Sequence, residues 1–298
     1  MDQAVPEPPA GRSPQVRACL RGVPETALYT LYHRAAAARR LPGLLHDPLA
    51  AEALERCDYP FRQRFGRPSA LVCRYLALRA RFFDREVARF LALHPGAVVV
   101  ALGEGLETQF WRVDDGRLRW LTVDLPEVVA LRRAVLPHGE RQWTAACSVL
   151  DPRWREHAVL GEGPVLLLAQ GLFPYLRPAD VTTLIGACAD RFPGGTLAFD
   201  TLPPWFAGLS RHGRRLFGLP PMPFGAAPGR LHRLKARLPD VADLRHVPVS
   251  GPPYGPCRAW AALEAVMRHG HRVPVVDRAL PANVRVEFRS RAARDVPP

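Results

Sequence analysis

The sequence has almost no lysine: Lys235 is the single one, and every other basic residue among the 41 is an arginine. It also lacks any apolar run approaching the roughly 20 residues that a membrane-spanning helix needs. The opening stretch, MDQAVPEPPAGRSPQV, has none of the apolar core of a signal peptide. These absences predict a soluble, cytoplasmic protein that does not enter a membrane and whose residues 1–20 form a disordered tail.

Closely spaced cysteine pairs are missing as well. The six cysteines are scattered along the chain, without the short spacings of a zinc site or a disulfide framework. They are Cys19, Cys57, Cys73, Cys147, Cys188 and Cys257. The sequence therefore predicts no metal site, and it predicts that these cysteines are small buried apolar side chains.

The net charge of +13 is unevenly distributed. Residues 95–210 carry 10 arginines against 13 acidic residues, so the basic excess lies in residues 1–94 and 211–298. No helix-turn-helix or pattern of stacking aromatics accompanies this charge, and arginine in place of lysine is typical of a GC-rich genome. Nucleic acid is therefore not expected as a partner, and an RNA-binding or RNA-methylating protein remains an alternative.

Helical patterns dominate the first third of the chain. Residues 24–56 contain two helical segments, and the second opens with Asp47 as its predicted N-cap and Pro48 at the first helical position. A long helix is predicted over 68–93. We expect residues 21–94 to form a helical cap.

An alternating pattern of strands and helices follows. Apolar runs predict strands at 97–102, 119–125, 142–149, 164–170 and 196–202, with helices at 126–136 and 177–192. Such alternation is typical of a doubly wound α/β fold with a mostly parallel sheet. Later segments, at 228–238, 241–249, 258–270 and 284–288, are expected to complete the sheet with an antiparallel edge. We expect 95–298 to form this domain, with a cap insertion near 203–240.

The stretch AVVVALGEGLETQFW places Gly103 and Gly105 directly after the first predicted strand. In open α/β sheets ligands bind outside the carboxyl ends of the strands, and glycine lets a ligand approach the backbone closely. Asp124 ends the second strand 21 residues after Gly103, where an acid can accept hydrogen bonds from ribose hydroxyls. The spacing predicts a nucleoside site, although a tight turn without a ligand remains an alternative.

The same loop argues against a dinucleotide. A third glycine is needed where Thr108 stands, and a pyrophosphate is disfavoured beside Glu104 and Glu107. A cationic nucleoside without phosphate, such as S-adenosylmethionine, suits an acidic loop better.

Longer motifs extend this interpretation over residues 21 to about 225. They include LRARFFDREV, LGEGLETQFWRVDDG, RWLTVDLPEVVALRRAVLP, LLLAQGLFPYL and RFPGGTLAFDT. In these segments the chain resembles the leucine carboxyl methyltransferase family, and within it the bacterial O-methyltransferases of polyketide and other natural-product biosynthesis. The resemblance implies a class I methyltransferase-like fold with a seven-stranded sheet. It also implies S-adenosyl-L-methionine as cofactor and methylation of a carboxylate or hydroxyl of a small molecule.

The resemblance also assigns cofactor-binding residues. Arg79 matches the arginine that grips the cofactor's methionine carboxylate, a planar bidentate pairing that lysine reproduces poorly. The other matches are Gly103 and Gly105 under the methionine moiety, Asp124 at the ribose, and Ser148 and Val149 beside the adenine.

Two positions depart from the family's pattern. The family usually has a glutamate facing the cofactor's ammonium where this chain has Gln170, and an aspartate where it has Glu107. An amide oxygen can still accept the ammonium's hydrogen bond, but the contact lacks charge assistance. The departures therefore predict weaker cofactor binding, and a catalytically silent relative is a second alternative.

Candidate catalytic residues are Tyr175, which should line the methyl-transfer cavity, and His212, which could deprotonate a hydroxyl acceptor. A carboxylate acceptor is already ionised and needs no base. We expect an anionic small molecule as acceptor, steered by Arg211, Arg214 and Arg215. Arg34 could bind an anionic acceptor or the cofactor carboxylate, but a position at the surface is the preferred prediction.

Overall fold

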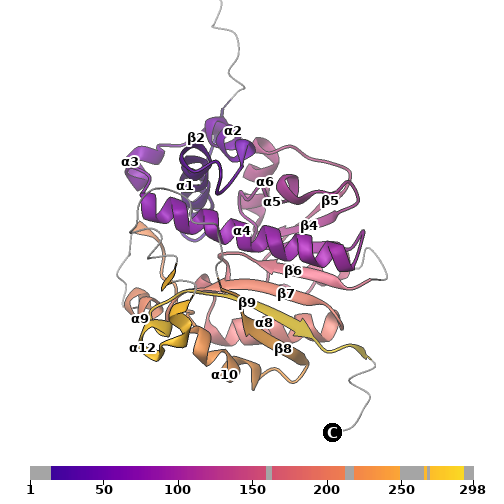
Figure 1. The fold of residues 1–298 in the computed structure, drawn as a ribbon. Helices are drawn as coiled ribbons and strands as arrows, with labels where there is room; N and C mark the ends of the chain where they lie inside the picture. The colour runs from indigo at the N-terminus through magenta and orange to yellow at the C-terminus, as the bar shows by residue number, and fades with distance from the viewer. Residues whose placement is uncertain (1–14, 159–162, 212–217, 249–264, 267–268, 292–298) are drawn as a thin grey trace, which may run out of the picture.

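The computed structural model describes residues 15–158, 163–211, 218–248, 265–266 and 269–291. A seven-stranded sheet in the order β5-β4-β3-β6-β7-β9-β8 runs through the molecule (Figure 1). Its strands are β3 (Val98–Leu102), β4 (Arg119–Asp124), β5 (Gln142–Ala146), β6 (Val165–Ala169), β7 (Thr196–Thr201), β8 (Val241–His246) and β9 (Ala282–Phe288). A separate two-stranded sheet joins β1 (Val16–Arg17) to β2 (Cys57–Asp58).

The predicted mostly parallel sheet with an antiparallel edge is confirmed. Strands β5, β4, β3, β6 and β7 pair in parallel, and β9 runs antiparallel between β7 and β8. Every residue of β3 and of β6 is buried. Parallel strands with both faces covered form continuous apolar runs, which is why these segments could be recognised in the sequence.

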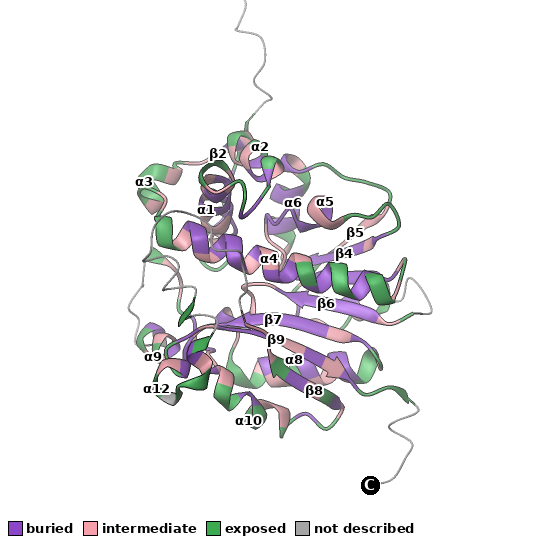
Figure 2. Ribbon diagram, in the orientation of Figure 1, coloured by how far each residue is buried: buried purple, intermediate pink, exposed green. Residues whose placement is uncertain are grey.

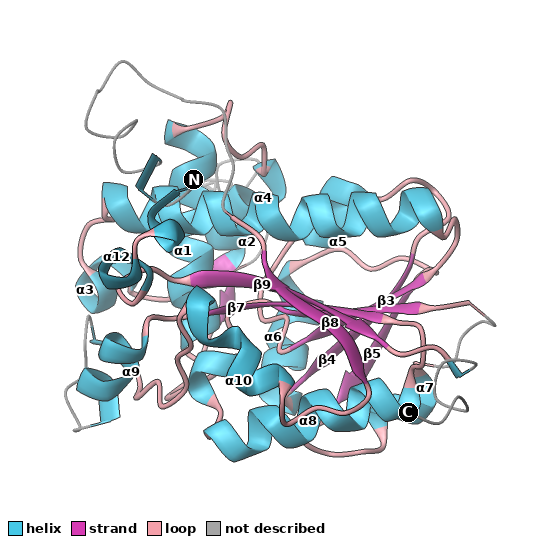
Figure 3. Ribbon diagram, turned by 60° about the horizontal axis from the view of Figure 1, so that its bottom comes forward, coloured by secondary structure: helices cyan, strands magenta, loops and turns pink. Residues whose placement is uncertain are grey.

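Helices cover both faces of the sheet (Figure 3). On one face lie α4 (Ala70–Leu93) and α5 (Gln109–Val113); Phe83 and Phe90 of α4 pack against Val99 and Leu166. On the other face α8 (Pro178–Arg191) and α7 (Trp154–His157) pack on alternate residues of the same strands. Buried residues accordingly concentrate in the strands and on the inner side of α4, whose outer side is exposed (Figure 2).

The N-terminal helices α1 (Thr26–Arg40), α2 (Pro48–Arg56) and α3 (Phe61–Phe65) lie together at one side of the molecule (Figure 1). The side chain of Asp47 caps α2 as predicted, accepting a hydrogen bond from the N–H of Ala50 at 3.1 Å. An apolar cluster joins α1 and α2 to α6 (Pro126–Val135). The second half of α4 instead covers a face of the sheet, and the domain division at residue 94 stays a prediction.

Some predicted segments differ from the structure in length or lie outside it. The strand predicted at 142–149 is β5, which ends at Ala146. The chain turns just after it, where Asp151 donates its N–H to the carbonyl of Ser148 at 2.9 Å. The predicted helix at 258–270 lies largely outside the described residues. Within the described part of the chain, no helix is both long and apolar enough to cross a membrane.

The C-terminal part adds short elements around β8 and β9. These are α9 (Pro204–Arg211), η3 (Pro228–Arg230), α10 (Leu231–Lys235), η4 (Gly270–Arg272) and α12 (Pro274–Asp277). No described residue of 203–240 lines the cavity at the carboxyl ends of the parallel strands, so the cap insertion expected there stays a prediction.

Candidate active site

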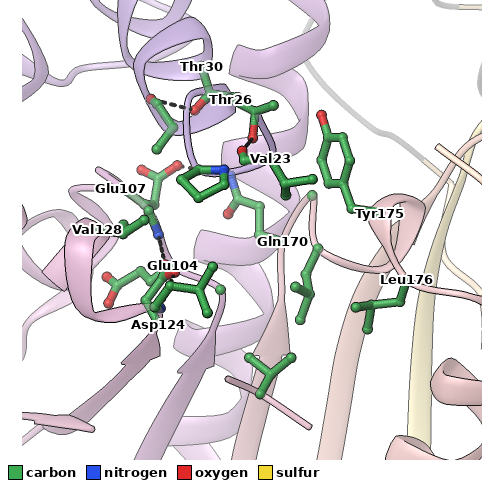
Figure 4. Close-up of a pocket in the computed structure, with 18 of the residues that line it drawn as sticks. Val23, Thr26, Thr30, Glu104, Glu107, Asp124, Val128, Gln170, Tyr175 and Leu176 are labelled. Atoms are coloured by element: carbon green, nitrogen blue, oxygen red, sulfur yellow. Dashed lines mark hydrogen bonds between the residues drawn. The ribbon is translucent and has the colours of Figure 1, made fainter. Parts of the chain in front are cut away.

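A cavity of about 290 Å³ lies at the carboxyl ends of the parallel strands, where the start of α1 covers them. Figure 4 shows Glu107 and Asp124 on one side, Tyr175 and Leu176 on the other, and Thr26 and Thr30 of α1 above. The structure brings all the predicted cofactor-binding residues into its lining: Arg79, Gly103, Gly105, Asp124, Ser148, Val149 and Gln170.

The glycine loop after β3 needs glycine for both conformation and space. Gly103 and Gly105 have φ angles of 59° and 60°, in the left-handed region that glycine favours. A Cβ on Gly103 would lie 2.8 Å from Cδ1 of Leu172, and one on Gly105 would lie 3.1 Å from Cβ of Ala27. The loop therefore lies in close contact with α1 and with the segment after β6.

Asp124, at the end of β4, binds the backbone of the glycine loop and of the residue that follows Asp124. Its Oδ2 accepts the N–H of Gly105 at 2.6 Å, and its Oδ1 accepts the N–H of Leu125 at 2.8 Å. Burial raises the pKa of Asp124, and the two backbone N–H groups oppose that shift. Each carboxylate oxygen can accept a second hydrogen bond, so Asp124 can also bind hydroxyl groups of a ligand in the cavity.

Arg79 reaches the cavity from α4. Its Nη1 lies 3.5 Å from Oδ2 of Asp200, while Oδ1 of Asp200 accepts the N–H of Gly171 at 2.5 Å. Burial acts to lower the pKa of Arg79, but the charge of Asp200 together with Tyr75, Glu107 and Tyr175 outweighs it, and the net shift is upward. The Nε of Arg79 has no hydrogen-bond partner. A charged guanidinium with spare donors suits a ligand carboxylate.

Gln170 follows β6 and lies between the two sides of the cavity (Figure 4). Its Nε2 donates to Oε2 of Glu107 at 2.9 Å, while its Oε1 is buried without a partner. A buried acceptor without a donor is costly unless a ligand supplies one. The lone oxygen therefore fits a ligand that brings a donor such as an ammonium group.

The predicted surface position of Arg34 is wrong, because this residue is only 2% exposed. Its Nε lies 2.8 Å from Oδ2 of Asp47, its Nη1 lies 2.9 Å from Oε2 of Glu107, and its Nη2 donates to the carbonyl of Leu106 at 2.7 Å. The face of α1 that carries Arg34 points at the glycine loop, where buried carboxylates need a cation. Arg34 thus joins the helical cap to the loop.

Glu104 is paired in the same way on the other side of the loop. It accepts hydrogen bonds from Thr122 Oγ1 at 2.5 Å, from Trp120 Nε1 at 3.2 Å and from Arg132 Nη2 at 2.7 Å. Nη1 of Arg132 also donates to the carbonyl oxygens of Gly105 and Glu107 at 3.0 and 2.6 Å. The loop is acidic, but its carboxylates are matched by internal arginines that the sequence analysis did not connect to it.

The start of α1 and the residues just before it also line the cavity, and five of these were not predicted site residues. The residues concerned are Val23, Pro24, Thr26, Ala27 and Thr30. They lie within the span that resembles the family, but no strand-end pattern singles them out, and nothing in their spacing links them to a loop some 80 residues further on. Only the packing of α1 against Gly105 makes them part of the site.

Of the two candidate catalytic residues, Tyr175 lines the cavity from the turn after β6. Burial raises the pKa of Tyr175 to about 12, so its hydroxyl stays protonated near neutral pH and can donate but not act as a base. His212 lies outside the described residues, as do Arg214 and Arg215.

The fold and this cavity are those of a methyltransferase that uses a nucleoside cofactor. The cavity supplies a guanidinium for a carboxylate, an unpartnered oxygen for an ammonium and a carboxylate at the ribose position, and glycines lie where a side chain would clash. These groups fit S-adenosylmethionine, whose amino acid and ribose need such partners.

Comparisons with known proteins agree with this assignment. The leucine carboxyl methyltransferase family model matches residues 27–189. The tetracenomycin polyketide synthesis O-methyltransferase TcmP of Streptomyces glaucescens is 34% identical over 74% of this chain and 81% of its own length. The S-adenosyl-L-methionine-dependent methyltransferase dpfgK of Gibberella zeae is 32% identical over 61% of this chain and 66% of its own.

A solved structure of a Thermobifida fusca YX protein assigned as a methyltransferase has a TM-score of 0.50. It is 18% identical and covers 90% of this chain and 95% of that one, a likeness that concerns the fold alone. The chain belongs to the leucine carboxyl methyltransferase family and is an S-adenosylmethionine-dependent methyltransferase.

Proposed function

We propose that the protein methylates an already ionised oxygen of a small molecule of polyketide type, a carboxylate in the first instance. The observation that carries this proposal is the lack of a free base among the described residues that line the cavity. The polyketide context comes from the likeness to TcmP, whose name specifies polyketide synthesis and O-methylation.

The residues of the cavity would hold the cofactor as a rigid electrophile. When bound, S-adenosylmethionine supplies a methyl group on a sulfonium. Arg79 would bind its carboxylate, Gln170 its ammonium and Asp124 its ribose hydroxyls, with Ser148 and Val149 beside the adenine. Since the leaving group is good, the task of these residues is to fix distance and direction for the acceptor, and proximity provides most of the acceleration.

The titratable groups in the described lining are all engaged or protonated. Glu104, Glu107 and Asp124 accept several hydrogen bonds each, and Tyr175 has a pKa of about 12. No histidine is among the described residues of the lining. With the ribose bound to Asp124, a neutral alcohol would find no free base in this set, whereas a carboxylate needs none.

A pH profile tests the proposal. With an ionised acceptor and with Tyr175 protonated throughout, we expect the methylation rate to stay nearly flat from about pH 6 to 9. Catalysis by a histidine would instead make the rate fall below about pH 6.5. The rate is measured with aromatic polyketide acids whose carboxyl or hydroxyl group is blocked in turn. Methylation of only the hydroxyl-bearing compound, lost in His212→Ala while cofactor binding persists, would show that the acceptor is not a carboxylate.

Replacing Tyr175 by phenylalanine tests whether its hydroxyl acts as a hydrogen-bond donor or as a catalytic base. The ring stays in place and only the hydroxyl is lost, so we expect kcat to fall by no more than about tenfold, the value of one neutral hydrogen bond. Cofactor affinity, measured by calorimetry, should remain near the wild-type value. A loss of several thousandfold in kcat would instead assign Tyr175 a direct chemical role.

A further inference from the structure

The side-chain amide of Gln170 has a hydrogen-bond partner for its nitrogen but none for its oxygen. Its Nε2 donates to Oε2 of Glu107 at 2.9 Å, and its Oε1 is buried in the cavity lining without a partner. A carboxylate can only accept hydrogen bonds, so the amide nitrogen must point to Glu107 and the oxygen must point away from it. Glu107 therefore decides which end of Gln170 a ligand meets.

Glu107 is itself held as a fixed anion. Its Oε2 lies 2.9 Å from Nη1 of Arg34, and its Oε1 accepts from Nη1 of Arg112 and from the N–H of Thr108, both at 2.9 Å. Burial acts to raise the pKa of Glu107, but the two guanidinium groups outweigh it and lower the pKa to about 2. The carboxylate is thus ionised at any working pH.

The two arginines that pair with Glu107 are shared with two further carboxylates. Arg34 and Arg112 also pair with Asp47, and Arg112 binds both carboxylate oxygens of Asp84 at 3.0 Å. This group of five side chains, the Glu107 cluster, contains one more carboxylate than guanidinium. Arg34 and Glu107 line the cavity directly, and Gln170 extends from Glu107 along the same lining.

We propose that Glu107 is a positioning residue that directs the oxygen of Gln170 to the ammonium of the cofactor. Through its hydrogen bond with the Gln170 amide, Glu107 also supplies the negative charge that a glutamine lacks. A hydrogen bond to an anion polarises the amide, which makes its oxygen a stronger acceptor. The surplus charge of the cluster also attracts a cation across a buried, weakly screened path. The two departures from the family's pattern, Glu107 and Gln170, therefore form one functional pair. This inference concerns the cofactor and is independent of the acceptor.

The pair changes the expectation drawn from the sequence for Gln170. The amide is not a weakened substitute, because its charge assistance comes from the neighbouring loop. Gln170→Glu alone would place two carboxylates where a hydrogen bond of 2.9 Å now exists, a like-charge contact. The exchange of both residues, Glu107→Gln with Gln170→Glu, keeps one carboxylate and one amide in contact.

The test uses calorimetry with two ligands that differ in the amino acid part, which carries the ammonium group. S-adenosylhomocysteine carries it, and methylthioadenosine lacks the whole amino acid. We expect Glu107→Gln to weaken binding of S-adenosylhomocysteine roughly tenfold or more, the value of a charge-assisted hydrogen bond, and to leave methylthioadenosine within about twofold. Adding Gln170→Glu to Glu107→Gln should restore most of the lost affinity.

The chain offers a matched control in Glu104. It is a buried glutamate of the same loop, lines the same cavity and pairs with Arg132, but its hydrogen bonds go to Trp120 and Thr122 rather than to Gln170. Gln170→Glu should therefore give no recovery when combined with Glu104→Gln. Equal recovery in both backgrounds would show a general effect of charge and would overturn the pairing.

Two further results would overturn the proposal. One is an equal loss for both ligands in Glu107→Gln, since a collapsed loop affects the whole nucleoside. The other is undiminished binding of S-adenosylhomocysteine in Gln170→Met, a variant of similar size that keeps Glu107 and the cluster intact. Gln170→Met decides the matter even if Glu107→Gln does not fold, and thermal melting identifies that case.

Discussion

Replacing Asp124 with alanine is expected to weaken binding of S-adenosylmethionine by at least about 100-fold. Two charge-assisted hydrogen bonds to the ribose are lost, each contributing about 1.5–3 kcal/mol. The carboxylate also accepts the N–H groups of Gly105 and Leu125, so the variant releases the glycine loop at the same time. Calorimetric titration of the purified variant with the cofactor and with S-adenosylhomocysteine measures the effect.

Two variants serve as controls for this experiment. Asp124→Asn keeps one acceptor oxygen and should bind between wild type and Asp124→Ala. Asp180→Ala removes a carboxylate that pairs with Arg177 at the exposed start of α8, and it should bind the cofactor normally. Wild-type affinity in Asp124→Ala would show that the ribose is held elsewhere.

Replacing Arg34 with methionine is expected to destabilise the fold by about 3–5 kcal/mol, the cost of leaving buried charges without their partner. The side chain of Arg34 is 3% exposed, and it contacts Asp47 and Glu107, whose side chains are 1% and 7% exposed. Both carboxylates would then face each other with only Arg112 between them. Urea denaturation followed by circular dichroism measures the free energy of unfolding.

Arg39 on the same helix provides the comparison. Its ion pair with Glu55 lies in solvent, with side chains 54% and 71% exposed, and such pairs contribute about 0–1 kcal/mol. Arg39→Ala should therefore unfold almost like wild type. Similar denaturation midpoints for Arg34→Met and wild type would contradict the assignment of Arg34 to a buried cluster that joins α1 to the glycine loop.

Continuous apolar runs account for the part of the sheet that could be predicted. Runs such as VVVAL and VLLLA are apolar throughout because both faces of a parallel strand are covered, and this pattern is local in the sequence. The end of β5 was missed by three residues, since the turn at Ser148 depends on backbone hydrogen bonds that the composition of the segment does not specify.

The predicted cofactor-binding residues were assigned from the sequence by two different routes. Gly103, Gly105 and Asp124 follow strands, and the carboxyl ends of parallel strands meet at one edge of the sheet. Arg79 comes from a helix and has no such geometric reason, so only the motif LRARFFD pointed to it. All of them line one cavity in the structure.

The sequence by itself determined the sheet and the edge of the sheet at which the cavity lies, because apolar strand runs and strand ends are local features. The class of ligand came from the resemblance to the family. The tertiary structure alone decided which charges meet. Arg34 and Glu107 are 73 residues apart, and no spacing rule connects an arginine of a cap helix to a glutamate of a strand-end loop. Their pairing arises because α1 packs against Gly105 and excludes water, so each buried carboxylate there requires a cation or an amide within reach.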